Sequence, residues 1–491
     1  MNRVAHVTNP LKDFDVDSRH VLINGQWRVA SGGVLDIENP SDGRVLGQIA
    51  LGSADDIDAA VTSAQGALET GWGRSTALER GRCLARLSAL VLENADALAR
   101  LESLDVGKPL TQARRDVVAL ARYCEFYAGA ADKIHGETLP FMDGYTVYTL
   151  REPHGVTGHI VPWNYPMQII GRSVGAALCM GNATVLKPAE EACLTALAFG
   201  ELTRRAGFPA GSVNVVPGLG AEAGAALSGH SGVQHVSFTG SVGTGAAVQR
   251  SAADNVVPVT LELGGKSAQL VFDDADIDAA LPLLVGAGIQ NAGQTCSAAS
   301  RLLIQRGIYD DVCSRIAERY AELRVGPAID DHDVGPLISA RQMSIVEAYL
   351  SQGSDLEILA TGQLVESLPV GGHYIVPTAF CAVDSRHVLA QQEIFGPVQV
   401  IIPFDDEDEA IAIANGTDFG LVAAVWTRDG SRQLRLARQL AAGQVFINDY
   451  GAAGGVELPF GGVGKSGHGR EKGFEALYGF SSLKTVAVRH G

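Results

Sequence analysis

The sequence lacks the patterns typical of disulfide-rich, metal-binding, membrane and secreted proteins. Its seven cysteines are odd in number and widely spaced without a C-x-x-C pair, so they indicate neither a disulfide framework nor a zinc site. Its 12 histidines show no H-E-x-x-H spacing, and we expect no bound metal. No apolar run approaches the roughly 20 residues that cross a membrane, and the start of the chain has no signal-peptide core. These absences favour a cytoplasmic protein that does not enter a membrane.

Positive charge and aromatic residues are also scarce. The 491 residues include 38 Lys and Arg against 55 Asp and Glu, a net charge of −17, which argues against binding to nucleic acid. Aromatic residues make up only 6%, whereas 58 glycines suit many tight turns between strands and helices. A chain of this length is too long for one core, so we predict two or three domains.

Helix signals dominate the first third of the chain. Ser53 precedes a helical segment with acids in its first turn, and Thr76 with Glu79 forms a capping box at the start of another. We expect the second segment to continue to Gly107 and Pro109, which end it.

From residue 155 onward, short strands alternate with helices. Strands are expected at 155–161, 183–187, 212–216, 233–238 and 258–263, which predicts a parallel α/β sheet. A second series begins near Gly264, with a helix at 309–324. Its expected strands are 267–272, 301–305, 398–404, 410–417, 421–427 and 443–448. The sequence therefore predicts a second α/β domain.

Two glycine-rich turns are candidates for holding a phosphate group. "PGLGAEAG" at 217–224 is one residue off the dinucleotide fingerprint, and "FTGSVGTG" at 238–245 places Gly240 and Gly243 between a strand and a helix. Backbone N–H groups at such a helix start can bind a pyrophosphate, although either turn is equally common as a plain connection. We favour the second turn because Ser241 adds a hydroxyl where the helix begins.

Cys296 lies in "NAGQTCSAASR", among residues too small to pack around a thiol. A free cysteine is ordinarily a small hydrophobe packed among larger ones. We therefore interpret Cys296 as a nucleophile, with an inert buried thiol as the alternative, and the other six cysteines as inert.

Seven stretches then identify a family. "PWNYP", "LKPAE", "FTGSVGTG", "ELGGKS", "NAGQTCS", "EIFGP" and "PFGGVGKSGHGRE" occur in this order and at fitting separations. The set resembles the aldehyde dehydrogenase superfamily from about residue 23 to the end of the chain. The resemblance implies NAD(P)-dependent oxidation of an aldehyde to the carboxylic acid, without acylation of CoA.

The resemblance implies three catalytic residues, Cys296, Glu262 and Asn164. A thiolate makes the aldehyde carbon tetrahedral, so that a hydride can leave it. The resulting oxyanion needs hydrogen-bond donors, which are implied to be the Asn164 amide and the backbone N–H of Cys296. Glu262 matches the general base that activates water to cleave the thioester. Taken alone, Glu262 is equally consistent with a surface carboxylate and Asn164 with a turn cap.

The resemblance also implies a cofactor site formed by Pro162, Trp163, Lys187, Glu190, Gly240, Ser241, Gly243, Leu263, Glu393 and Phe395. Lys187 and Glu190 match residues that bind the adenosine ribose. A glutamate there accepts hydrogen bonds from ribose hydroxyls and repels a 2′-phosphate, so we predict NAD in preference to NADP. The alternative is a loop salt bridge worth less than about 1 kcal/mol. Glu393 matches the ligand of the nicotinamide ribose and Phe395 lies beside the ring.

Six residues match positions that line the family's aldehyde tunnel: Tyr165, Ile169, Arg172, Gln290, Ser297 and Phe460. Arg172 is two helical turns after Tyr165 and on the same face. A guanidinium suits a substrate carboxylate, so we predict a carboxylate-bearing semialdehyde or an aromatic aldehyde. Gln290 replaces the second arginine of succinic-semialdehyde enzymes, which leaves the clamp incomplete. A structural ion pair of Arg172 is the other interpretation.

The family architecture implies two open, doubly wound α/β domains and a small β element. Residues 1–131 and 152–263 would form a Rossmann-like NAD domain, and 264–477 the catalytic domain. Residues 132–151 and 478–491 would form the oligomerisation element of a homodimer or homotetramer. The stretch 143–153 alternates like an edge strand.

Three competing interpretations are less consistent with the residues. A CoA-acylating semialdehyde dehydrogenase would lack the base at Glu262. A thiol hydrolase would need a histidine near Cys296, and no histidine lies in a partner motif. A binding or structural relative without activity would have lost Cys296, Glu262 or Asn164.

Overall fold

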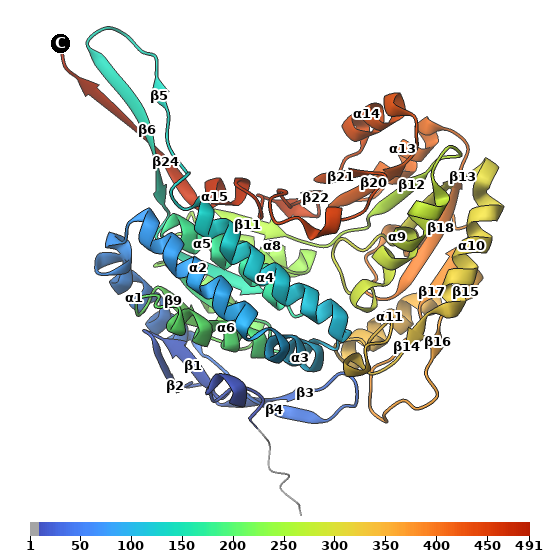
Figure 1. The fold of residues 1–491 in the computed structure, drawn as a ribbon, viewed down its shortest axis with the longest axis horizontal. Coiled ribbons are helices and arrows are strands. Elements are labelled where there is room, and N and C mark those ends of the chain that lie inside the picture. The colour runs from blue at the N-terminus through green and yellow to red at the C-terminus, as the bar shows by residue number, and fades with distance from the viewer. Residues whose placement is uncertain (1–8) are drawn as a thin grey trace, which may run out of the picture.

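Two α/β bodies lie side by side, and a β arm projects from the first of them (Figure 1). The computed structural model describes residues 9–491, so the first eight residues of the expected 1–131 segment lie outside the described residues. Each body is built around one large sheet covered by helices, as predicted for an α/β protein of two domains.

The first body contains an eight-stranded sheet. Its order is β2 (Gln26–Val29), β1 (His20–Ile23), β9 (Val213–Val215), β8 (Ala183–Pro188), β7 (Val156–Val161), β10 (His235–Thr239), β11 (Val259–Glu262) and β23 (Gly467–His468). The five strands from β9 to β11 are parallel and correspond to the five predicted from the sequence. The outer strands β1, β2 and β23 run antiparallel to their neighbours.

Helices cover both faces of this sheet. They are α1 (Ala54–Glu69), α2 (Ala77–Glu93), α3 (Ala95–Val106), α4 (Leu110–Ala130), α5 (Pro166–Met180), α6 (Leu194–Arg205), α7 (Ala225–Ser228), α8 (Val242–Ala253) and α15 (Glu475–Gly479). The predicted capping residues Ser53 and Thr76 accept hydrogen bonds from the first turns of α1 and α2.

The helical region predicted from Thr76 to Gly107 is confirmed, and it consists of two helices. The chain leaves helical geometry at Asn94, whose side-chain amide donates to the Leu90 carbonyl oxygen at 2.7 Å. Asparagine competes in this way for backbone hydrogen bonds, so α2 ends and α3 begins there. Gly107 ends α3 in the left-handed conformation, with φ of 81°.

The second body contains a seven-stranded sheet. Its order is β15 (Glu357–Thr361), β17 (Thr378–Cys381), β18 (Val398–Phe404), β13 (Arg301–Gln305), β12 (Ala268–Val271), β20 (Val422–Trp426) and β21 (Gln444–Ile447). Its helices are α9 (Ile277–Ile289), α10 (Tyr309–Glu322), α11 (Ala340–Gln352), α12 (Val388–Gln391), α13 (Glu407–Asn415) and α14 (Gly430–Gln439). The remaining short strands are β3 (Val34–Glu38), β4 (Val45–Ala50), β14 (Arg324–Val325), β16 (Gln363–Leu364), β19 (Phe419–Gly420) and β22 (Val463–Gly464).

The strand expected at 410–417 is instead part of α13. Asp406 accepts a hydrogen bond from the Glu409 N–H, and three acids from Glu407 to Glu409 occupy the first turn of the helix. A capping residue followed by acids favours a helix start strongly enough to override the alternating apolar pattern.

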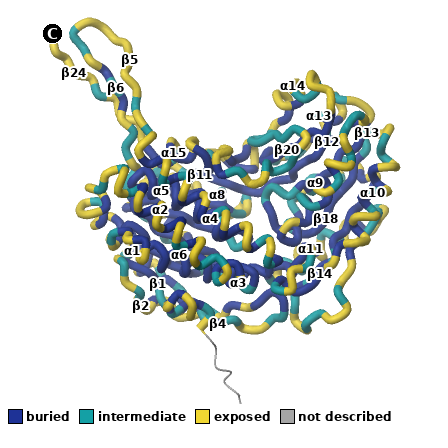
Figure 2. Tube along the Cα trace, in the orientation of Figure 1, coloured by how far each residue is buried: buried dark blue, intermediate teal, exposed yellow. Residues whose placement is uncertain are grey.

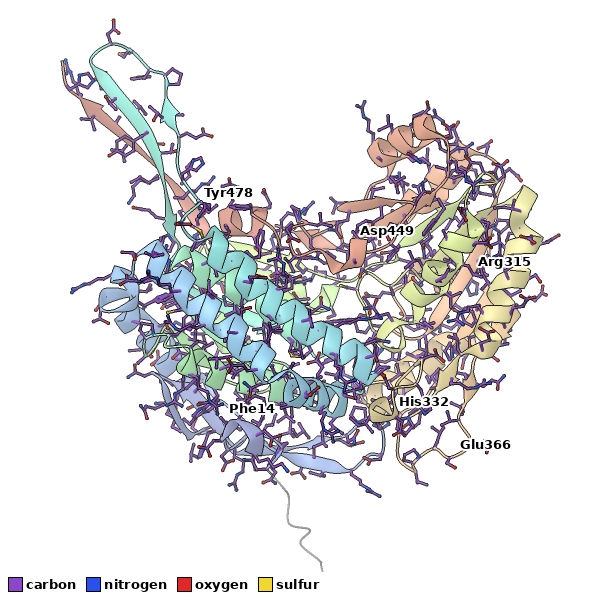
Figure 3. The ribbon with its side chains drawn as sticks, in the orientation of Figure 1. Phe14, Arg315, His332, Glu366, Asp449 and Tyr478 are labelled. Carbon is purple, nitrogen blue, oxygen red and sulfur yellow. The ribbon has the colours of Figure 1, made fainter. Side chains whose placement is uncertain are left out.

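The β arm consists of β24 (Ser481–Arg489), β6 (Tyr145–Pro153) and β5 (Thr138–Leu139), in that order. The predicted edge strand β6 lies in the middle, because β24 pairs antiparallel with it along its whole length. The arm is mostly exposed (Figure 2). Tyr478 lies at the root of the arm (Figure 3). Its ring centroid is 4.8 Å from the Arg151 guanidinium.

The chain returns to the first body near its end. Val456, Ala476, Leu477 and Phe480 are buried in the apolar core formed by the N-terminal half of the chain. The strand β23 also extends the first sheet beside β11. Most of these residues belong to the segment 264–477 that was expected in the second domain, so the two bodies share the C-terminal segment.

Candidate active site

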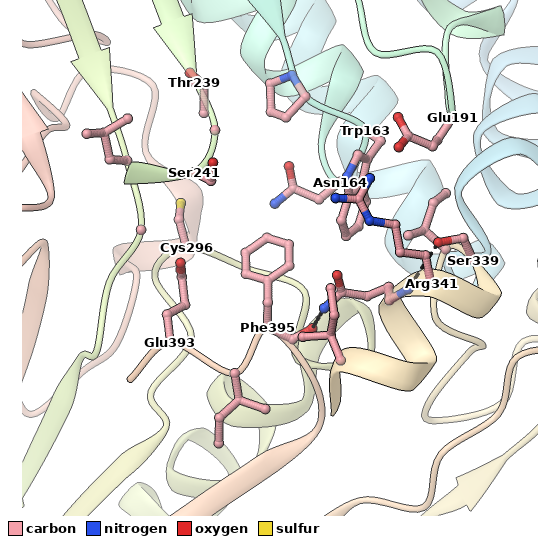
Figure 4. A pocket seen from close by; sticks show the side chains of 18 of the residues that line it. Trp163, Asn164, Glu191, Thr239, Ser241, Cys296, Ser339, Arg341, Glu393 and Phe395 are labelled. Carbon is pink, nitrogen blue, oxygen red and sulfur yellow. Dashed lines mark hydrogen bonds between the residues drawn. The ribbon is translucent and has the colours of Figure 1, made fainter. Parts of the chain in front are cut away.

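A cavity of about 360 Å³ opens where the two bodies meet (Figure 4). The first body lines it with Pro162, Trp163, Asn164, Thr239, Gly240, Ser241, Glu262 and Leu263, and the second with Cys296, Ser339, Arg341, Gln342, Glu393 and Phe395. The first set lies at the carboxyl ends of the parallel strands β7, β10 and β11. Ligands of open α/β sheets bind at this edge.

The nucleophile candidate Cys296 lies on a loop of unusual backbone conformation. Asn291, Ala292 and Gly293 before it all have positive φ, which turns the chain sharply after α9. Six of the seven free cysteines are buried, whereas Cys296 is half-buried. The loop packs closely on Gly265, where a Cβ would lie 2.3 Å from the Cys296 carbonyl oxygen.

Three hydrogen bonds tie this loop to the segment after β7. The Asn164 side-chain amide donates to the Gln294 carbonyl oxygen at 3.0 Å, and Asn291 donates to the Asn164 carbonyl oxygen at 3.0 Å. The Tyr165 hydroxyl lies 3.1 Å from the Thr295 hydroxyl. The side-chain NH₂ of Asn164 has two N–H groups, and only one donates to the Gln294 carbonyl oxygen, so the other is free to bind a ligand.

The buried ammonium group of Lys108 packs against the ring of Tyr165. The Lys108 ammonium lies 4.0 Å from the Tyr165 ring centroid and 2.8 Å from Glu102, and it also contacts Asp116. Because Lys108 is fully buried, these two carboxylates are its charge partners. The cluster fixes the start of α5, where Asn164 and Tyr165 lie.

Burial dominates the electrostatics of the cavity. It raises the pKa of the Cys296 thiol to about 12. Burial also raises the pKa of Glu262 well above the usual carboxyl range, and neither carboxyl oxygen has a hydrogen-bond partner within the described chain. The positive charge of Arg172 opposes both shifts. Burial therefore makes both groups weaker acids, and the Arg172 charge offsets part of this effect.

Arg172 already has a partner. Its Nε lies 2.5 Å from a carboxyl oxygen of Glu471, and its guanidinium lies 4.9 Å from the Phe460 ring centroid. Glu471 is fully buried and also accepts from the Ser237 hydroxyl at 2.6 Å. This contact is the structural ion pair that was the second interpretation of Arg172, and it does not require a substrate carboxylate.

The expected cofactor residues fall into two groups. Lys187 and Glu190 pair at 2.9 Å, and Glu190 also accepts from the backbone N–H of Gly220 at 3.3 Å. Of the two glycine-rich turns, the favoured one at 238–245 borders the cavity with Gly240 and Ser241, whereas Gly243 lies within the first turn of α8 and faces open space.

The hydroxyl of Ser241 caps α8, accepting from the Thr244 N–H at 3.3 Å. On the opposite wall, Glu393 accepts from the Gly265 N–H at 3.0 Å. Burial raises the pKa of Glu393 to about 7. Phe395 packs edge-on against Trp163, with ring centroids 5.4 Å apart.

The expected substrate residues are dispersed. Tyr165, Ile169 and Phe460 are buried, Ser297 is half-buried, and Gln290 is exposed. Cys296, Phe446 and Tyr450 pack against a buried apolar cluster of Leu421, Val422 and Phe460. Sequence reasoning missed Glu191, Arg341, Phe446, Tyr450 and Glu471. Only Glu471 carried a signal, since it ends the quoted stretch "PFGGVGKSGHGRE".

Comparison with known proteins decides the family. The profile described as "Aldehyde dehydrogenase family" matches residues 27–486. The chain belongs to this family. This aldehyde dehydrogenase is 41% identical over 472 residues to hydroxyisobutyraldehyde dehydrogenase of Mycolicibacterium austroafricanum, covering 95% of this chain and 93% of the relative.

Solved structures agree with the assignment. The crystal structure of a candidate aldehyde dehydrogenase from Burkholderia cenocepacia has a TM-score of 0.96 at 59% identity, covering 96% of this chain and all of that one. The NAD⁺ complex of aldehyde dehydrogenase from Bacillus cereus has a TM-score of 0.94 at 38% identity, with 99% of each chain covered. The fold is thus that of the family, and the protein is an NAD(P)-dependent oxidoreductase of aldehydes.

The cavity fits a dinucleotide. It combines a helix start capped by Ser241, the apolar rings of Trp163 and Phe395, and the buried amide oxygen of Asn164, which has no partner within residues 9–491.

Within residues 9–491, no group of three or more His, Cys, Asp or Glu side chains is arranged to hold a metal ion. No helix of the described chain is long and apolar enough to cross a membrane.

Proposed function

We propose that Cys296, Glu262 and Asn164 carry out the oxidation. The observation that carries this proposal is their meeting in one cavity, with a half-buried thiol, an unpartnered carboxyl and a free amide N–H group. The Cys296 thiol gives its proton to solvent, and its sulfur bonds to the aldehyde carbon. The substrate oxygen, now an oxyanion, accepts from the Asn164 amide and the Cys296 backbone N–H.

The carbon then loses its hydrogen with both bonding electrons, and a bound nicotinamide dinucleotide is the acceptor of that pair. A thioester on Cys296 remains. Glu262 in its ionised form takes a proton from water, whose oxygen bonds to the thioester carbon, and later gives that proton to solvent. The carbon–sulfur bond breaks, and the carboxylic acid leaves with the Cys296 thiolate restored. Appearance of reduced cofactor with a panel of aldehydes tests this proposal.

We propose NAD as the preferred cofactor, bound at the adenosine ribose by Lys187 and Glu190. Burial alone would raise the pKa of Glu190, but the Lys187 ammonium and hydrogen bonds outweigh it and lower that pKa. The ionised carboxylate would repel a 2′-phosphate. Glu190→Gln is therefore expected to raise kcat/KM for NADP relative to NAD by about tenfold. Equal values for the two cofactors in the wild type would refute the preference.

For the substrate we propose an aromatic aldehyde rather than a carboxylate-bearing one. Two observations support this choice. The charge of Arg172 is already balanced by Glu471, so a substrate carboxylate would have to compete with a buried ion pair. Cys296 packs against the same apolar cluster as Phe446 and Tyr450, and this cluster includes Phe460, so aromatic rings that suit a flat apolar group lie near the thiol.

Arg172→Ala is expected to lower kcat/KM for benzaldehyde and succinic semialdehyde by similar factors. The guanidinium stabilises the ionised forms of Cys296 and Glu262, so its loss also moves the pH profile to higher pH. Arg172→Lys keeps the charge and is the control. A rise in KM confined to succinic semialdehyde would instead identify Arg172 as a carboxylate clamp.

We also propose a cytoplasmic homodimer or homotetramer joined through the β arm. The arm exposes Leu139, Phe141, Met142, Leu150, Leu483 and Val488, which a second copy would cover. The seven cysteines are all free, which suits a reducing compartment. Phe141→Asp with Leu483→Asp is expected to reduce the mass in light scattering to that of one chain, and an unchanged mass would exclude the arm as the interface.

A further inference from the structure

The cavity wall holds more carboxyl groups than basic side chains. Three carboxyl groups line it, those of Glu191, Glu262 and Glu393. Within residues 9–491, Arg341 is the only lysine or arginine in the lining. A dinucleotide carries two negative charges on its diphosphate, which a guanidinium attracts. Arg341 is therefore the side chain of this lining that can form an ion pair with the diphosphate.

The position of Arg341 suits this task. It projects from α11 of the second body toward Trp163 and Glu191 of the first (Figure 4). Its side chain is exposed, and it has no ion-pair partner within 4.0 Å among the described residues. Burial and the neighbouring Glu190 raise the pKa of Glu191, and Arg341 is close enough to oppose that shift. The guanidinium thus reaches the opposite wall without being fixed there.

The local structure of α11 conflicts with an arginine at this place. Ser339 caps the helix, accepting from the Gln342 N–H at 3.2 Å, so Arg341 is in the first turn. Cations are unfavourable at a helix N-terminus, where the partial charge is positive, and acids are preferred. Residues that break a local preference are commonly functional. An anion bound in the cavity would offset the repulsion between the Arg341 guanidinium and the positive end of α11, because both attract it.

We propose that Arg341 binds the cofactor diphosphate from the side opposite to Ser241. The diphosphate would then contact both bodies, through α11 of the second and the start of α8 of the first. This inference rests on the cofactor site proposed above. It adds a specificity-determining residue, since ligands without a diphosphate would gain nothing from Arg341. Bound cofactor would also link α11 to the first body through charge-assisted hydrogen bonds.

Binding of NADH, ADP-ribose and adenosine, measured by calorimetry on the full chain, tests the proposal. Arg341→Gln is expected to raise the Kd of NADH and ADP-ribose about tenfold, as for loss of one charge-assisted hydrogen bond, and to leave that of adenosine unchanged. Arg341→Lys should recover part of the loss. Arg438→Gln removes the same charge from the exposed end of α14 and is the matched control.

The remaining outcomes overturn the proposal in distinguishable ways. An unchanged Kd of NADH, or an equal loss for adenosine, would exclude contact with the diphosphate. If Arg341 serves only to neutralise Glu191, the double variant with Glu191→Gln would bind NADH as tightly as the wild type. Failure of the wild type to bind NADH at all would instead reject the cofactor site itself.

Discussion

Cys296→Ser is expected to lower kcat for aldehyde oxidation by about 10⁴-fold or more, the scale of losing a covalent nucleophile. A hydroxyl is far less acidic than a thiol, and burial here already raises the pKa of the thiol to about 12. The serine oxygen would keep its proton, and the aldehyde carbon would stay planar. Reduced-cofactor absorbance measures the loss, and unchanged NADH binding would show that the cavity is intact.

The control for this experiment is another thiol of the same chain. Cys313 is buried in the second core, away from the cavity, so Cys313→Ser is expected to retain activity. Mass spectrometry of the wild type, quenched during turnover, should find an acyl adduct on Cys296. Normal turnover of Cys296→Ser, or an adduct at a different residue, would contradict the proposed mechanism.

Glu262→Gln is expected to form one equivalent of reduced cofactor per site and then to slow by about 10²- to 10⁴-fold. The amide cannot take a proton from water, so the thioester on Cys296 persists after the first turnover. Rapid-mixing absorbance separates the fast first phase from the slow steady state. Glu475→Gln, at the exposed start of α15, is the control.

The pH profile gives an independent measure of Glu262. Only the ionised carboxylate is a base, so kcat of the wild type should rise with pH through the pKa of this group. Because burial raises that pKa, the rise should occur above the usual carboxyl range and be absent from Glu262→Gln. An equally steep rise in the variant would assign the titration to another group. Loss of the first turnover as well would mean that Glu262 is also indispensable for removing the thiol proton.

Local signals in the sequence predicted local structure well. Ser53 and Thr76 were predicted as helix caps because each accepts hydrogen bonds from backbone N–H groups no more than three residues later, so the whole motif is visible in the sequence. The parallel strands around β7 were also predicted, since short strand patterns alternate with helical ones in this part of the sequence. Errors arose where a competing local effect was stronger, as in the capped first turn of α13, or where pairing depended on a distant segment, as for β6 and β24.

The site could be predicted only as far as its motifs extend. Ordered motifs predicted Cys296, Glu262 and Asn164 as catalytic residues, and all three line the cavity. The partner of Arg172 could not be inferred, because Glu471 is distant in the chain and no pattern of spacing encodes an ion pair between separate segments. Arg341 was missed for a related reason: one arginine in a helix is ordinary until a cavity is seen beside it.

The return of the C-terminal segment to the first body has a consequence for biosynthesis. On the ribosome, β11 emerges long before β23, so the strand that carries Glu262 has an unpaired edge while most of the second body is being made. The apolar surface later covered by Val456, Leu477 and Phe480 stays uncovered for the same time. A gene fragment encoding the N-terminal half alone should therefore yield an aggregating product, and chaperones should engage the nascent chain during this interval.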